Sequence, residues 1–158
     1  MDSKQDVHPK IRNWCSRAER SPLQVLRKLS DWGEKDTAEA QLSVLEREGY
    51  VDRSRFSEAF ATDQIRLKNW GPAKVKAALR QVHGITTQMA ESAIFEVGQE
   101  EVDLAALRAA KGWRRIRGAA PEEKALAALL RRGFTFECAK RAVKAAVSAQ
   151  PAATDASA

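Results

Sequence analysis

Apolar residues recur along this chain at the three-to-four-residue spacing of amphipathic helices. No segment shows the strict alternation or the β-branched density that is typical of a strand. Within residues 71–84, the positions that this spacing predicts to face inward are Val75, Ala78, Leu79 and Val82. The pattern therefore predicts an all-α protein.

One helical unit occurs three times, in residues 21–33, 71–84 and 120–133. Each copy places a proline near its start and a glycine at its end, and these residues are Pro22 and Gly33, Pro72 and Gly84, and Pro121 and Gly133. Proline is preorganised for the first turn of a helix, and glycine readily adopts the left-handed conformation that closes one. Each copy should therefore be a helix of about three turns with both ends marked in the sequence.

Further amphipathic segments precede and follow each copy, so that three helices belong to each repeat. In the last segment the apolar positions are Phe136, Ala139, Val143 and Val147, and the candidate caps of the three final helices are Asp36 or Thr37, Thr86 or Thr87, and Thr135. We expect three tandem three-helix repeats that form an elongated, curved array. The expected bounds are residues 9–50, 51–98 and 99–149, with disordered ends at residues 1–8 and 150–158.

Composition excludes several classes of protein. The only cysteines are Cys15 and Cys138 and the only histidines are His8 and His83, so no spaced metal cluster is present and we expect no metal and no cofactor. No nucleophile signature or glycine-rich phosphate loop is found, which argues against an enzyme. No apolar run reaches the ~20 residues of a membrane span, and the first residues lack the apolar region of a signal peptide, so a cytoplasmic protein is expected.

Positive charge increases toward the C-terminal end of the chain. The net charge is +6, while residues 99–158 contain 11 Lys and Arg against 7 Asp and Glu, and residues 1–50 are neutral. A basic surface favours an anionic partner. We therefore hypothesise that the main anionic contact is made by Lys111, Arg114, Arg115, Arg117, Arg131 and Arg132.

Residues 45–85 carry a more specific signal than periodicity. Its characteristic positions are Leu45, Gly49, Tyr50, Asp52, Arg55, Phe56 and Phe60, followed by Trp70, Gly71, Pro72, Lys74, Leu79, Gly84 and Ile85. This pattern resembles the signature of the RecX family, the bacterial modulators of the RecA recombinase, with Ser57 where alanine is usual. About 40 residues carry this specific match, and the threefold frame extends the resemblance over most of the chain.

The resemblance implies a regulatory protein that binds the RecA–single-stranded-DNA filament, inhibits its ATP hydrolysis and strand exchange, and promotes filament loss in DNA repair. It implies no catalytic site. The expected partners are RecA and single-stranded DNA, with weaker binding to double-stranded DNA, and a monomer is expected. Two alternatives stay open, a basic helical DNA-binding protein that does not depend on RecA, and a helical-repeat scaffold for another protein.

Individual residues of the motif have structural and functional interpretations. Lys74, Lys76 and Arg80 lie off the inward stripe, so they are either a solvated face or contacts to phosphates or to RecA. Trp70 either packs at a helix junction or stacks on a base. Asp52 is predicted to cap a helix, and Arg55 to pair with a nearby acid.

Two more predictions concern aromatic side chains of the same region. Phe56 and Phe60 lie four residues apart on one helical face and should be in the core. His83 precedes Gly84 at a helix end, where a partial positive charge would suit the terminal carbonyl groups.

Overall fold

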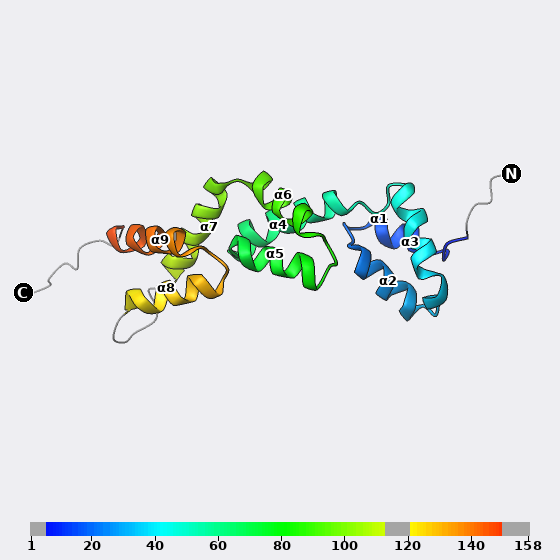
Figure 1. Ribbon diagram of the computed structural model, residues 1–158, viewed down its shortest axis with the longest axis horizontal. Coiled ribbons are helices and arrows are strands. Elements are labelled where there is room, and N and C mark those ends of the chain that lie inside the picture. Colours follow the sequence, from blue (N-terminus) through cyan, green and yellow to red (C-terminus); the bar gives the residue numbers. More distant parts are fainter. Residues whose placement is uncertain (1–5, 113–120, 150–158) are drawn as a thin grey trace, which may run out of the picture. The chain divides into compact units, whose positions relative to one another are not determined.

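The computed structural model describes residues 6–112 and 121–149, and these residues form α-helices and one short 3-10 helix, with no strand among them. The all-α prediction is confirmed (Figure 1). The α-helices are α1 (Ile11–Ser16), α2 (Pro22–Asp31), α3 (Ala38–Arg47), α4 (Arg53–Lys68), α5 (Pro72–Gln81), α6 (Thr87–Val97), α7 (Gln99–Gly112), α8 (Pro121–Arg131) and α9 (Phe136–Ser148), and the 3-10 helix η1 is Lys35–Thr37. None of the helices in the described ranges is long and apolar enough to cross a membrane.

The chain divides into two compact units, whose boundary passes through α4 and α5. Unit 1 comprises residues 1–61 and 76–96, and unit 2 comprises residues 62–75 and 97–158. The first part of α4 and the last part of α5 therefore belong to unit 1, and the rest of these two helices belongs to unit 2. The threefold division at residues 50 and 98 stays a prediction.

The repeated frame of proline and glycine is confirmed at all three places. Helices α2, α5 and α8 begin at Pro22, Pro72 and Pro121. Each helix ends two or three residues before a glycine with a positive φ, and these glycines are Gly33 (81°), Gly84 (69°) and Gly133 (96°). At the first frame Ser21 forms a capping box, in which its Oγ accepts from Gln24 N and its own N–H donates to the Gln24 side chain.

Two of the predicted final-helix caps form. Thr86 Oγ1 accepts from Met89 N (3.3 Å) at α6, and Thr135 Oγ1 accepts from Cys138 N (3.2 Å) at α9. Thr37 makes no side-chain cap to α3, because the 3-10 turn η1 enters this helix and Thr37 Oγ1 donates to Glu34 instead.

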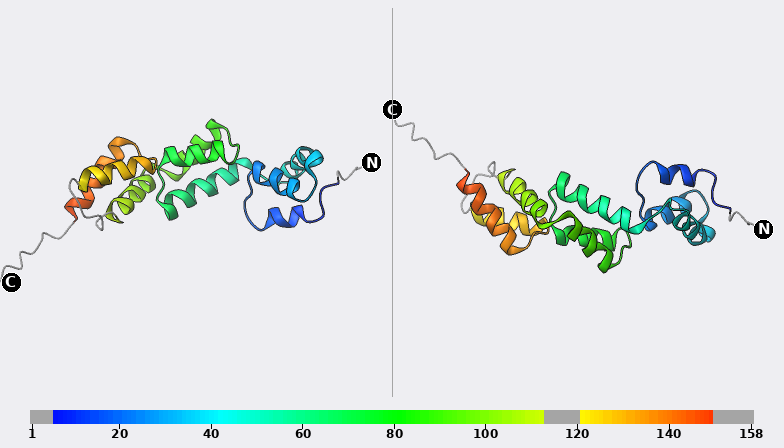
Figure 2. Two further views of the ribbon diagram at one scale, coloured as in Figure 1. Left: turned by 90° about the horizontal axis from the view of Figure 1, so that it is seen from below. Right: turned by 90° about the horizontal axis from the view of Figure 1, so that it is seen from above.

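The core of the N-terminal part of unit 1 joins α1, α2 and α3 (Figures 1 and 2). Its most deeply buried side chains are Ile11, Val25, Leu29 and Leu45. Residues 7 and 8, which precede α1, contact this core. Val7 packs on the cluster, and His8 stacks on Trp32 with ring centroids 4.5 Å apart and donates its backbone N–H to Gln41 Oε1 (2.8 Å).

In unit 2 the core among α7, α8 and α9 is built mainly from small side chains. Ala105, Ala106, Ala139 and Ala142 are all buried, together with Val102, Leu129 and Val143. Small residues allow helix backbones to approach closely, so that this core depends on close packing rather than on large side chains. The predicted apolar stripe of α9 is only partly buried, since Phe136 is 55% and Val147 42% exposed.

Candidate functional site

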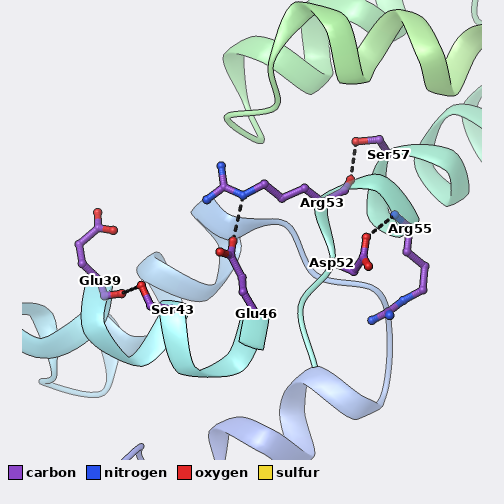
Figure 3. Close-up of polar contacts among 7 residues, drawn as sticks. All are labelled: Glu39, Ser43, Glu46, Asp52, Arg53, Arg55 and Ser57. Atoms are coloured by element: carbon purple, nitrogen blue, oxygen red, sulfur yellow. Dashed lines mark hydrogen bonds and ion pairs between the residues drawn. The ribbon is translucent and has the colours of Figure 1, made fainter. Parts of the chain in front are cut away.

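Asp52 and Arg55 of the motif organise the start of α4 (Figure 3). Asp52 Oδ1 accepts from Arg55 N at 2.9 Å, which confirms the predicted N-cap. The Arg55 side chain pairs with Glu19 and also donates to the carbonyl of Gly49 (3.1 Å), so its predicted acidic partner is found. These contacts join the loop before α2 to the start of α4, which is a structural task.

Arg53 and Ser57, also near the start of α4, make polar contacts that are structural as well. Arg53 Nε donates to Glu46 Oε1 at 2.9 Å and links α4 to α3 (Figure 3). Ser57, where the family pattern has alanine, is fully buried, and its Oγ donates to the Arg53 carbonyl at 2.7 Å. The extra hydroxyl is therefore satisfied within its own helix, which allows it in the core. Gly49 has a φ of 82° and Tyr50 packs on the unit 1 core.

Phe56 and Phe60 are brought together with His83. Phe56 is buried and Phe60 half-buried, and the two rings stack with centroids 5.8 Å apart. His83 lies against both, at 4.8 Å from Phe56 and 4.9 Å from Phe60. The core prediction for this pair is confirmed for Phe56 and holds in part for Phe60.

The surroundings of His83 do not favour the partial positive charge that the sequence suggests for it. The side chain is 8% exposed, and its Nδ1 lies 3.0 Å from Ser21 Oγ. Burial lowers the pKa of His83, and the charge of Arg27 lowers it further. A neutral imidazole is therefore favoured, and it serves as a junction residue rather than as a positive charge for the helix end.

Trp70, Gly71 and Pro72 form a junction in unit 2. Gly71 N donates to the Arg132 carbonyl (2.7 Å) and Ala73 N donates to the Gly133 carbonyl (3.0 Å). Carbonyl groups of the two residues after α8 thus accept hydrogen bonds from N–H groups at the start of α5, which have no partner within their own helix. The sequence explained Gly71–Pro72 as a helix start but did not indicate this partner.

Trp70 and Lys74 form a pair in the same unit. Lys74 Nζ lies 4.3 Å from the centroid of the half-buried Trp70 ring. The ammonium group covers one face of the indole, as in a cation–π contact. This arrangement favours the packing interpretation of Trp70 over base stacking.

The remaining candidates on α5 lie in unit 1 and differ in their contacts. Lys76 pairs with Glu91 of α6 (2.7 Å), whereas Arg80 is exposed and has no ion pair or hydrogen bond among the described residues. Leu79 and Ile85 are buried as predicted. The prediction that Val82 faces inward is wrong, since this residue, the first after α5, is 52% exposed.

The C-terminal cations also separate into two groups. Arg132 Nη1 donates to the carbonyls of Lys68 (3.0 Å) and Asn69 (3.4 Å), so its guanidinium caps the end of α4. Lys111 and Arg131 are exposed and form no ion pair or hydrogen bond within the described ranges. Arg114, Arg115 and Arg117 lie outside the residues that the structure describes.

Arg108 is a residue that the sequence analysis missed. Its Nε donates to Asn69 Oδ1 (2.8 Å), and its Nη2 donates to the Ile65 (3.4 Å) and Arg66 (3.2 Å) carbonyls. Arg108 of α7 and Arg132, the residue after α8, therefore both bind the C-terminal turn of α4, where positive charge is favourable. Asn69, directly after α4, has a φ of 55°.

A second missed feature is a set of cations on tryptophan faces in unit 1. Arg20 lies 4.0 Å from the Trp14 ring centroid, and Lys28 lies 5.1 Å from that of Trp32 and 5.6 Å from that of Trp14. These cations lie within the first 50 residues, whose net charge is zero, so the distribution of charge along the sequence did not indicate them. Across the part of the chain that is described, no group of three His, Cys, Asp or Glu side chains is placed to hold a metal ion.

Comparison with known proteins agrees with the motif. The family model of the second three-helix domain of RecX matches residues 54–94. The regulatory protein RecX of Leuconostoc citreum (strain KM20) is 26% identical over 136 residues, which cover 83% of this chain and 51% of that protein. The chain thus spans about half the length of this relative.

Two solved structures share the fold. The crystal structure of RecX from Lactobacillus salivarius matches with a TM-score of 0.73 and 17% identity, over 87% of this chain and 92% of that one. A crystal structure of a regulatory protein RecX matches with a TM-score of 0.74 and 20% identity, over 84% of this chain and 67% of that one. The family-model match and the curated relative agree with the motif in α4 and α5 and support a relationship to the RecX family. The two solved structures show that the fold is shared.

Proposed function

We propose that this protein binds the RecA–single-stranded-DNA filament and restrains RecA ATP hydrolysis, strand exchange and filament persistence. The observation that carries the proposal is the RecX relationship, which the motif, the family model and the curated relative support independently of charge. The protein acts by binding and needs no catalytic residue of its own. Inhibition follows if it bridges neighbouring RecA protomers and blocks the rearrangements that turnover requires.

The cations divide into better and poorer candidates for the filament contact. Lys74, Lys76 and Arg132 already contact Trp70, Glu91 and backbone carbonyls, so binding through them would have to replace these contacts. Arg80, Lys111 and Arg131 are exposed, and their charges are available without that cost. We assign the filament contact to these three and to Arg114, Arg115 and Arg117.

The test measures RecA ATPase on single-stranded DNA with increasing amounts of the purified protein. We expect inhibition that saturates, and absence of an effect at every ratio would contradict the proposal. The variant Arg114→Glu/Arg115→Glu/Arg117→Glu should bind the filament more weakly and with a smaller dependence on salt, since each lost phosphate contact lowers the salt slope by about one.

A matched control reverses three charges elsewhere. Lys10, Arg17 and Lys35 are exposed in unit 1, and their side chains form no ion pair or hydrogen bond among the described residues. The variant Lys10→Glu/Arg17→Glu/Lys35→Glu has the same net charge as the test variant and should retain filament binding. Equal loss in both variants would assign the effect to overall charge instead of to the C-terminal cations.

A second candidate is a basic DNA-binding protein that does not require RecA. The net charge of +6 and the three-helix domains favour it. The discriminating measurement compares affinity for naked single-stranded DNA with affinity for the RecA-coated filament at one salt concentration. Equal affinities would favour this second candidate.

A further inference from the structure

An open groove of about 400 Å³ lies between α8 and α9 of unit 2. The two helices run side by side (Figures 1 and 2). The floor is apolar and includes Leu126, Phe136, Val143 and Val147. Phe136 and Val147 are the two residues of the predicted apolar stripe that the unit does not bury, at 55% and 42% exposed.

The two sides of the groove carry opposite charges. Glu122 and Glu123 of α8 lie along one side, and Lys140 and Lys144 of α9 along the other. All four residues are exposed, and none forms an ion pair or hydrogen bond within the described residues. An apolar floor between a negative and a positive side is a specific arrangement, because a ligand must satisfy all three surfaces at once.

We propose that this groove binds an amphipathic helix of another protein, whose apolar face is flanked by acidic residues on one side and basic residues on the other. The floor has the length for such a ligand, since the 11 residues of α8 span about 16 Å, or three helical turns. A helix that presents apolar residues at positions i, i+4, i+7 and i+11 covers about 16 Å, which is the length from Phe136 to Val147 on α9. Its acidic flank would face Lys140 and Lys144, and its basic flank would face Glu122 and Glu123.

Other occupants fit the groove less well. A nucleic acid would bring phosphates to Glu122 and Glu123 and would leave the apolar floor unused. Residues 150–158 contain no large apolar side chain that could cover Phe136. The inference is independent of the proposed filament function, because it rests on α8 and α9 alone and includes none of the cations assigned above.

The test uses the full chain and three designed helical peptides of about 16 residues with the same apolar face. One peptide has an acidic and a basic flank, one has two acidic flanks and one has two basic flanks. Peptide affinity is measured by fluorescence anisotropy, and the contact surface by amide chemical shifts of the labelled protein. We expect the mixed peptide to bind about fivefold more tightly than either uniform peptide and to shift the amides of Leu126, Phe136 and Val143.

Charge reversal of each side should change the preference in opposite directions. Glu122→Lys/Glu123→Lys makes both sides basic and should favour the peptide with two acidic flanks. Lys140→Glu/Lys144→Glu makes both sides acidic and should favour the peptide with two basic flanks. These four side chains are exposed, so the fold should tolerate both variants.

Phe136→Asp should abolish binding of the mixed peptide, whereas the control variant Phe95→Asp, at an exposed phenylalanine of α6 in unit 1, should bind it normally. Equal binding of all three peptides, or shifts confined to other helices, would overturn the proposal. Self-association that depends on Phe136 would also overturn it, since the groove would then bind a second copy, and sedimentation across protein concentrations detects this.

Discussion

In each unit, the end of one proline–glycine helix contacts the start of another, and the two junctions are formed by different kinds of contact. In unit 1 the residues after α5 contact the start of α2 through side chains, with His83 Nδ1 3.0 Å from Ser21 Oγ. In unit 2 the residues after α8 contact the start of α5 through the backbone, by the hydrogen bonds from Gly71 to Arg132 and from Ala73 to Gly133.

The difference lies in the space that each junction leaves for a side chain. A Cβ atom at Gly84 in unit 1 would come within 3.0 Å of the flexible Leu23 side chain. A Cβ atom at Gly71 in unit 2 would lie 2.3 Å from backbone atoms of Gly133 and Phe134, which cannot move independently. The same proline–glycine pattern can therefore form a junction through side chains or through the backbone alone. The backbone junction tolerates fewer substitutions, because no Cβ atom fits at Gly71.

The largest effect is expected for Gly71→Ala. The clash with the backbone after α8 should open the unit 2 junction and lower the free energy of unfolding by about 3 kcal/mol. Chemical denaturation checks this, and amide hydrogen exchange should show the loss first in unit 2. The matched control is Gly112→Ala in α7, where a Cβ atom meets nothing within 4 Å. If both variants were equally stable, the close backbone approach would not matter to stability.

A smaller effect is expected for Ser21→Ala in unit 1. The change removes the cap of α2 and leaves the buried His83 Nδ1 without its partner, at a cost of about 2 kcal/mol in the free energy of unfolding. Ser43→Ala is the control, because the Ser43 hydroxyl is exposed and donates only to the Glu39 carbonyl of its own helix (Figure 3). A Ser21→Ala variant as stable as this control would argue against a side-chain junction.

Arg132→Ala should have a weaker effect, because the guanidinium is exposed. Loss of its bonds to the Lys68 and Asn69 carbonyls should cost about 1 kcal/mol of unfolding free energy. Arg131→Ala next to it should be neutral for stability, since Arg131 has no hydrogen bond or ion pair among the described residues. If filament binding were measured on the same variants, Arg131→Ala should weaken binding more than its effect on stability would explain.

The smallest effect is a dependence on pH in unit 1. Because the folded state lowers the pKa of His83, the unfolded state binds the proton more readily, and stability is full above the unfolded pKa of about 6.5 and declines as the pH falls below it. Unfolding should be compared at about pH 7.5 and about pH 5.5 for the protein and for His83→Gln. The variant should lose less stability on acidification, and an identical loss would show that His83 does not contribute.

Local rules of the chain were sufficient for the helices and for much of the motif. The caps at Asp52, Thr86 and Thr135 depend on residues within one turn of each other, and the glycine conformations depend on a single residue. Such contacts are short in sequence, so composition and spacing predict them. The family motif was recognisable for the same reason, since it consists largely of these helix starts, helix ends and core positions.

The tertiary structure decided which charged side chains form contacts and which groups contact each helix end. Arg131 and Arg132 are neighbours in the sequence, yet one is free of partners among the described residues and the other caps α4 from more than 60 residues away. His83 is buried against two phenylalanines and Ser21, and this burial lowers its pKa. Phe136 is exposed because α9 packs on α7 and α8 with its small residues. The sequence alone thus determined where helices begin and end, because those signals are local, while only the folded chain decided which side chains are buried, paired or available, because these properties depend on distant neighbours.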